Sequence, residues 1–189
     1  MIENSKAKTR RGVIFIAGAY GTGKTTIAEQ LSKDFGLPCF QASELITAVN
    51  KEAYGKKKDV SDVGDNQKIL ADSVNALLDK YDIILLTGHF AIFDKNRQVV
   101  RIPTDVFSKI NLSAIILLEA PQEKIMMHLG KRDAVEYSTA EISELVTAER
   151  ELATGVATQI KVPLYIHQMN YDNGDSDKIA KYIKTEVFA

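Results

Sequence analysis

A short apolar run followed at once by a glycine-rich turn is the feature of this sequence that most constrains its fold. Residues 13–17 are apolar, and residues 18–25 read GAYGTGKT, which satisfies the pattern GxxxxGK[ST]. The glycines let the backbone turn sharply, so that successive N–H groups face one concavity that an anion can occupy. Apolar residues then recur at helical spacing over residues 27–35, and the N-terminus of such a helix adds partial positive charge. The sequence therefore predicts a binding site for the phosphates of a nucleoside triphosphate.

Individual loop residues suit specific roles. Lys24 can reach the β- and γ-phosphates of a bound nucleotide, and the Thr25 hydroxyl can ligate Mg²⁺. We therefore expect ATP and Mg²⁺ as ligands, with Lys24 also contributing to catalysis. A strand-to-helix turn that merely happens to be rich in glycine is the competing interpretation, and the flanking apolar patterns disfavour it. The residues expected to contact ATP are Gly18, Ala19, Tyr20, Gly21, Thr22, Gly23, Lys24, Thr25 and Thr26.

Charge and composition limit the kinds of partner. The 189 residues carry a net charge of −1, so no overall field attracts nucleic acid or an anionic membrane. Residues 1–11 are rich in Lys and Arg, and we interpret them as a flexible basic arm. The sequence has no apolar stretch long enough for a membrane span and no hydrophobic signal segment, and the lone Cys39 cannot form an internal disulfide. These features predict a cytoplasmic protein.

Apolar runs alternate with helical patterns along the chain. Four strands are expected after the first, at residues 37–41, 83–86, 115–118 and 162–167. Helices are expected at residues 66–78 and 175–187, and a capping box of Ser138 and Glu141 opens another, long helix. This alternation predicts an α/β fold: one three-layer P-loop NTPase domain over residues 1–189, with a five-stranded parallel sheet and helices on both faces. Ligands should gather at the carboxyl ends of its strands.

The order of these parts resembles nucleoside monophosphate kinases, most of all the short archaeal-type adenylate kinases. The resemblance covers most of the chain, and residues 18–25 match the ATP loop of that family residue by residue. It implies that residues 42–80 form a helical segment on the acceptor side, in which Ser43 and Glu44 face the acceptor nucleotide. It also places His89 beside the acceptor, at the end of the third strand. The alternative for His89 is a histidine held by backbone groups at a turn.

The same resemblance assigns catalytic arginines. Residues 128–139 correspond to a short lid, in which Lys131 and Arg132 stand in place of an arginine-rich segment. Arg150 corresponds to a helix arginine that contacts the transferring phosphates, so Arg132 and Arg150 are expected to neutralise charge there. A surface salt bridge with a neighbouring glutamate is the alternative for Arg150. Arg101 is a further candidate for acceptor contact, with a solvated loop charge as the alternative.

Two departures from the family pattern concern the acceptor side. Thr87 stands where an acidic residue is expected after the third strand, which leaves Mg²⁺ to Thr25, the phosphates and water. Lysines at 56–58 stand where an arginine for the acceptor phosphate is expected, and lysine lacks the planar, bidentate fork of arginine. Asp94 could supply the missing acid, although an aspartate there also suits a turn.

These residues predict an enzyme that transfers the γ-phosphoryl group of ATP to a small acceptor. A nucleoside monophosphate is the first candidate for the acceptor. A nucleoside or another small metabolite is the second, because lysines in place of arginines suit a less charged molecule. A third interpretation is a nucleotide-sensing protein or slow ATPase that acts together with a protein partner. Neither nucleic acid nor a membrane is expected as a partner.

Overall fold

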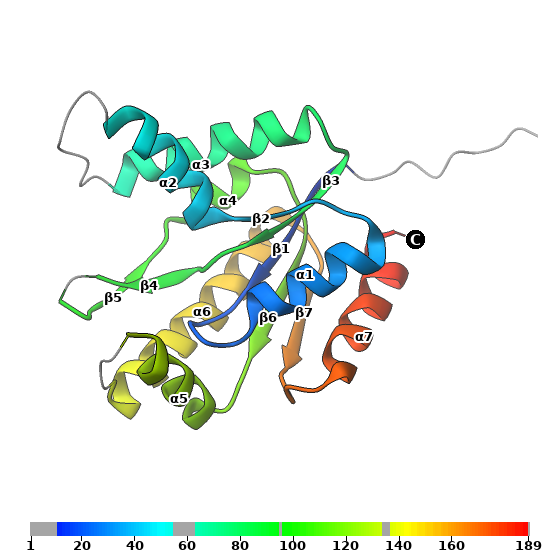
Figure 1. Cartoon of the computed structure of the whole chain (residues 1–189). Helices are drawn as coiled ribbons and strands as arrows, with labels where there is room; N and C mark the ends of the chain where they lie inside the picture. The colour runs from blue at the N-terminus through cyan, green and yellow to red at the C-terminus, as the bar shows by residue number, and fades with distance from the viewer. Residues whose placement is uncertain (1–10, 55–62, 95, 134–136, 189) are drawn as a thin grey trace, which may run out of the picture.

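A five-stranded parallel sheet forms the centre of the protein (Figure 1). The computed structural model describes residues 11–54, 63–94, 96–133 and 137–188. The strands lie in the order β2-β3-β1-β6-β7. Their bounds are β1 Gly12–Ala17, β2 Cys39–Gln41, β3 Ile83–Thr87, β6 Leu112–Glu119 and β7 Leu164–Gln168. The α/β fold class with five parallel strands is thereby confirmed, and each strand overlaps the apolar run that predicts it.

Helices cover both faces of the sheet (Figure 1). Alternate residues of β1 point to opposite faces, so Ile14 and Ile16 enter one core cluster while Val13 and Phe15 enter another. The first cluster includes residues of α1 (Lys24–Phe35), α5 (Gln122–Asp133) and α7 (Asn173–Tyr182). The second includes residues of α3 (Val63–Leu78) and the short α4 (Thr104–Lys109). This arrangement confirms the three layers that the sequence predicts.

The long helix α6 (Thr139–Ile160) joins the two clusters. Its first half contributes Ile142 and Leu145 to the first cluster, and its second half contributes Ala153 and Val156 to the second. The expected capping box is present, because Ser138 accepts from the Glu141 backbone N–H while the Glu141 carboxylate accepts from the Ser138 N–H. A turn of π-helix, Ile183–Val187, follows α7 where the sequence predicts one continuous helix.

Two short strands between β3 and α4 were not predicted from the sequence. Strands β4 (Ala91–Phe93) and β5 (Val99–Arg101) pair antiparallel as a separate hairpin. The Asp94 carboxylate accepts from the backbone N–H groups of Asn96 and Gln98, so Asp94 acts as the turn residue of that hairpin. Three-residue strands carry too little alternation for a periodicity signal to reveal them.

Three further predictions concern the N-terminal residues, membrane-spanning helices and Cys39. Residues 1–10 of the expected basic arm lie outside the described part of the chain, whereas the Arg11 guanidinium donates to the Leu78 carbonyl and pairs with Asp79. Within the described ranges, no helix combines the length and the apolar character needed to cross a lipid bilayer. The Cys39 thiol is free and half-buried, and this burial raises its pKa, so it is poorly suited to act as a nucleophile.

Candidate active site

The turn between β1 and α1 leaves the N-terminus of α1 open to an anion. Gly23 occupies the N-cap position with φ of 90°, a left-handed conformation that glycine adopts without strain. No side chain caps the first turn of α1, and that turn contains no acidic residue. The N–H groups and the positive end of the helix dipole therefore suit a phosphate group.

Lys24 is held at the mouth of this turn by three acceptors. Its ammonium Nζ lies 2.7 Å from the Gly18 carbonyl oxygen, 2.9 Å from that of Ala19 and 3.0 Å from His89 Nε2. Because an ammonium group only donates, His89 Nε2 must accept, which puts the proton of the neutral imidazole on Nδ1. Lys24 thus links the loop after β1 to the segment after β3.

Other loop residues divide between shaping the turn and lining a cavity. The Thr22 hydroxyl donates to the Ala19 carbonyl at 2.9 Å and is only 1% exposed, so Thr22 is a structural residue of the turn. Tyr20 packs against His89, with the ring centroids 4.4 Å apart. Thr25 and Thr26 are exposed and line the cavity.

The Thr25 hydroxyl is the group that would hold Mg²⁺. Among the residues that the structure describes, no three His, Cys, Asp or Glu side chains form a cluster that could bind a metal. Thr25 and the phosphates of the nucleotide, completed by water, fit Mg²⁺, which keeps several waters when bound. The ion would supply positive charge that offsets the negative charge of the phosphates.

A cavity of about 600 Å³ opens beside the loop at the carboxyl ends of β1, β2 and β3. One end is formed by the loop and α1, and the other by a largely apolar wall from α2 (Ala42–Tyr54), α3, β4 and α4. The lining residues of the loop end are Tyr20, Gly21, Gly23, Lys24, Thr25 and Thr26. Polar residues from the ends of the neighbouring strands are Gln41, Ser43, Thr87 and His89.

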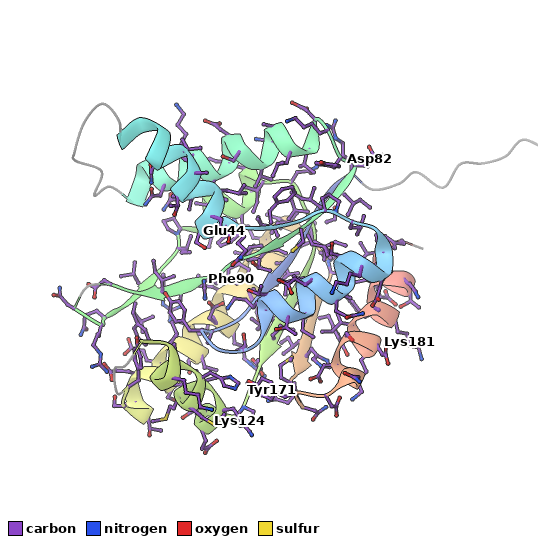
Figure 2. The ribbon with its side chains drawn as sticks, in the orientation of Figure 1. Glu44, Asp82, Phe90, Lys124, Tyr171 and Lys181 are labelled. Atoms are coloured by element: carbon purple, nitrogen blue, oxygen red, sulfur yellow. The ribbon has the colours of Figure 1, made fainter. Side chains whose placement is uncertain are left out.

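The structure brings two of the four expected acceptor contacts into this cavity. Ser43 and His89 line it, as does Thr87, the residue in the place of the missing acid. Glu44 lies in the first turn of α2 (Figure 2). Its carboxylate accepts from the Gln41 side-chain amide at 2.8 Å, and it borders a second, smaller hollow. Arg101 lies on β5 and pairs with Glu151 of α6 at 2.6 Å. In the described structure Arg101 does not line the cavity.

The expected catalytic arginines lie on α5 and α6. Arg150 is 57% exposed and binds the Glu119 carboxylate at the end of β6 in a bidentate pair, with Nε to Oε1 at 2.6 Å. This hydrogen bond raises the pKa of Arg150. Arg132 belongs to α5, but its side chain lies outside the described part of the chain, as do the lysines at 56–58. Lys131 is described and exposed.

A buried carboxylate beside the site was missed by the sequence analysis. Glu149 of α6 is 2% exposed, and its carboxylate accepts from the backbone N–H of Phe90 at 3.1 Å and of Ala91 at 3.3 Å. Burial raises the pKa of Glu149 to about 7, against the opposing effects of the Lys24 charge and these N–H groups. The signal was present, because Glu149 lies four residues after Leu145 on the buried stripe of α6.

The loop is also supported on its other side. The Gly21 carbonyl oxygen lies 2.7 Å from His128 Nδ1 of α5 and 3.4 Å from the Tyr171 hydroxyl. Tyr171 is labelled in Figure 2 and follows β7. The buried Asp175 carboxylate accepts from the Tyr171 backbone N–H at 2.7 Å and contacts His167 Nε2 at 2.8 Å. These hydrogen bonds lower the pKa of Asp175, although burial opposes them. The segment after β7 is therefore held against the phosphate loop.

Solved structures share this architecture at low sequence identity. A candidate kinase from Chloroflexus aurantiacus gives a TM-score of 0.62 at 14% identity, over 94% of this chain and 98% of that one. A sugar kinase from Janibacter sp. gives 0.57 at 16% identity, over 94% and 95% of the two chains. Shikimate kinase from Acinetobacter baumannii in complex with shikimate gives 0.53 at 18% identity, over 97% of each chain. At these identities the likeness establishes the fold.

Sequence comparisons place the chain in a broader group than the expected one. No curated protein matches the sequence. The structural matches support a P-loop kinase fold, while the finer resemblance to archaeal-type adenylate kinases stays a prediction. A family model described as an AAA domain matches residues 17–146, which is more than half of the chain. The protein therefore belongs to the AAA_17 family of AAA domains.

Proposed function

We propose that the protein is an ATP-dependent phosphotransferase that acts on a small molecule. The observation that carries this proposal is the cavity that begins at Lys24 and Thr25 and continues past the phosphate loop to a separate wall. The lining continues from the loop to apolar side chains of α2, α3 and α4, which offers a surface for a second molecule next to the phosphates. A sugar kinase and a shikimate kinase share the fold, which supports a small acceptor.

The residues present can perform the transfer. The loop N–H groups and Lys24 would hold the triphosphate, with Mg²⁺ at Thr25. A bond forms between an acceptor oxygen and the γ-phosphorus, while the bond from that phosphorus to the β,γ-bridging oxygen breaks and ADP leaves with its electron pair. For a hydroxyl acceptor, His89 Nε2 would take the proton once the Lys24 ammonium has turned from it to the phosphates, because the lone pair of that nitrogen is then available. Arg150, once released from Glu119, would neutralise charge on the equatorial oxygens.

Two acceptor classes fit this scheme. A nucleoside monophosphate is the acceptor implied by the family resemblance. A nucleoside or other metabolite with a hydroxyl group is the second class, and the described lining of the cavity supports it, since that lining contains no arginine.

A direct assay tests the proposal. ADP formation and labelled product are measured with γ-labelled ATP, Mg²⁺ and a panel of monophosphates, nucleosides, sugars and other alcohols. We expect product that depends on an acceptor and saturates with ATP. Saturable ATP binding without product from any acceptor would contradict the kinase proposal and favour the nucleotide-sensing or slow-ATPase interpretation.

A further inference from the structure

The wall of the cavity that faces the phosphate loop is apolar and preformed. This wall contains aromatic rings that pack on one another. The ring centroids of Phe15 and Phe107 are 5.6 Å apart, and both side chains are only 2% exposed. Such closely packed rings cannot easily rearrange to present other groups. The apolar lining residues are Phe15, Ile46, Leu70, Ile92, Ile102, Val106 and Phe107.

Charge is nearly absent from this lining. Among the described lining residues, Lys24 alone carries a full charge, apart from the titratable His89. Lys24 lies in the phosphate loop, where it is needed for the phosphates of ATP. Against this described lining, a carboxylate or phosphate on the acceptor body would lose its hydration to apolar side chains without gaining a cation from them, which is strongly unfavourable.

Outside the phosphate loop, the polar side chains of the described lining lie near the carboxyl ends of β2 and β3. Gln41 and Thr87 end these strands, Ser43 lies in the first turn of α2, and His89 follows β3. His89 Nε2 is 3.0 Å from Lys24 Nζ, so it lies at the boundary between the phosphate end and the apolar end. Such a boundary suits a molecule with one hydroxyl group on an otherwise apolar body.

We infer that the acceptor is an uncharged alcohol with an aromatic or alicyclic body, bound with its hydroxyl toward His89 and its body against the apolar wall. This inference rests on the proposed function and names the substrate class of the same site. The acceptor oxygen bonds to the γ-phosphorus, the bond to the bridging oxygen breaks, ADP keeps the electron pair, and the hydroxyl proton passes to His89 and then to water.

Matched probe pairs test the inference on the wild-type protein. The first pair is benzyl alcohol and 4-(hydroxymethyl)benzoate, and the second is adenosine and adenosine 5′-monophosphate. Each probe is assayed for transfer from ATP and, separately, for equilibrium binding to the protein saturated with a non-hydrolysable ATP analogue. We expect the uncharged member of at least one pair to exceed its charged partner by about tenfold or more in both measurements.

A variant pair on α2 locates the binding site. Ile46→Arg puts a long cation into the apolar wall and should weaken binding of the uncharged probe about tenfold or more, with the affinity for the ATP analogue unchanged. Val49→Arg, on the same helix at a 39% exposed position outside the lining, should change neither. Ile46→Ala, which adds no charge, should weaken binding of the same probe to a smaller extent. It replaces Ile46→Arg as the test if that variant does not fold.

The outcomes separate this inference from the proposed function. Failure of the uncharged member to exceed its charged partner in both pairs, binding of neither member of either pair, or equal loss in Ile46→Arg and Val49→Arg would overturn the assignment of the acceptor class. Transfer only to the charged probes, adenosine 5′-monophosphate or 4-(hydroxymethyl)benzoate, would also overturn that assignment, but it would leave the kinase proposal intact. Failure to bind ATP, or binding of an uncharged probe without any transfer, would count against the kinase proposal instead.

Discussion

The Glu149 carboxylate accepts the backbone N–H of Phe90 through both of its oxygens, each at 3.1 Å, in the interior of the protein. The two residues are 59 positions apart in sequence. Phe90 directly follows His89, so this contact fixes the segment that presents the imidazole to Lys24. Glu149 is thus a positioning residue: it acts on the site through the backbone after β3.

The raised pKa of Glu149 makes stability depend on pH. The folded pKa of about 7 lies above the ordinary value of 4.5, so the protonated carboxyl stabilises the fold below about pH 4.5, and this stabilisation is lost as the pH rises through 7. Glu149→Gln removes the titration. Between pH 5.5 and pH 8, the free energy of unfolding of the wild type should fall relative to that of Glu149→Gln by about 2 kcal/mol.

Urea unfolding at both pH values measures this difference. Glu151→Gln, on the exposed side of the same helix, is the matched control and should show no comparable change with pH. A constant difference between wild type and Glu149→Gln across this range would mean that Glu149 is ionised throughout.

Replacement of Lys24 should impair both phosphoryl transfer and ATP binding. In Lys24→Ala the loop loses the one side chain that can follow the transferring phosphate, so transfer should fall about 10³-fold or more. ATP affinity, measured by titration calorimetry, should also drop. Lys33→Ala, in the exposed last turn of the same helix, should match the wild type, and similar behaviour of the two variants would rule out this role for Lys24.

His89 should affect the chemical step more than nucleotide binding. The amide oxygen of His89→Gln can still accept from Lys24, but it cannot take a proton, so kcat should fall about 10²-fold or more while ATP affinity stays near that of the wild type. Lys33→Ala, in the exposed last turn of α1, is again the control. Full turnover in His89→Gln would show that the imidazole takes no proton during transfer. It would favour the alternative that His89 is a histidine held by backbone groups at a turn.

Arg150, which pairs with Glu119 in the structure, has two possible roles that Arg150→Ala separates: charge neutralisation during transfer, or a surface ion pair alone. If Arg150 neutralises charge during transfer, Arg150→Ala should lower kcat about 10³-fold at unchanged ATP affinity. If it is only a surface ion pair, the variant should lose no more than about 1 kcal/mol of stability and keep its activity. Arg101→Ala breaks the comparable exposed pair with Glu151 and serves as the control in both measurements.

Gly88 leaves no space for a side chain beneath the cavity. A Cβ atom at this position would lie 2.7 Å from ring atoms of the buried Phe15, so Gly88→Ala should lower the free energy of unfolding by about 1–3 kcal/mol. At Gly155, in the exposed interior of α6, a Cβ would meet nothing within 4 Å. Gly155→Ala should therefore stabilise by up to about 1 kcal/mol. Thermal or urea unfolding of both variants tests this, and equal effects would contradict it.

Local patterns explain which elements could be predicted. The phosphate loop and α6 with its capping box depend on residues a few positions apart, and the parallel strands appear as continuous apolar runs. The β4–β5 hairpin has strands too short for periodicity, and it was missed. Arg150 illustrates a different difficulty: the alternative to a phosphate contact was a salt bridge with a neighbouring glutamate, yet the partner in the structure is Glu119, which is 31 positions away.

The sequence alone determined the loop, the parallel α/β sheet and the edge at which ligands gather, because those features follow from residue spacing within elements and from the order of elements along the chain. Only the tertiary structure decided the character of the acceptor end. Phe15, Ile46, Leu70 and Phe107 come from four different elements, and nothing in their own neighbourhoods distinguishes a cavity wall from ordinary core. Glu149 is also defined by its surroundings, since a carboxylate on a helix becomes a buried anchor only when a distant backbone segment packs onto it.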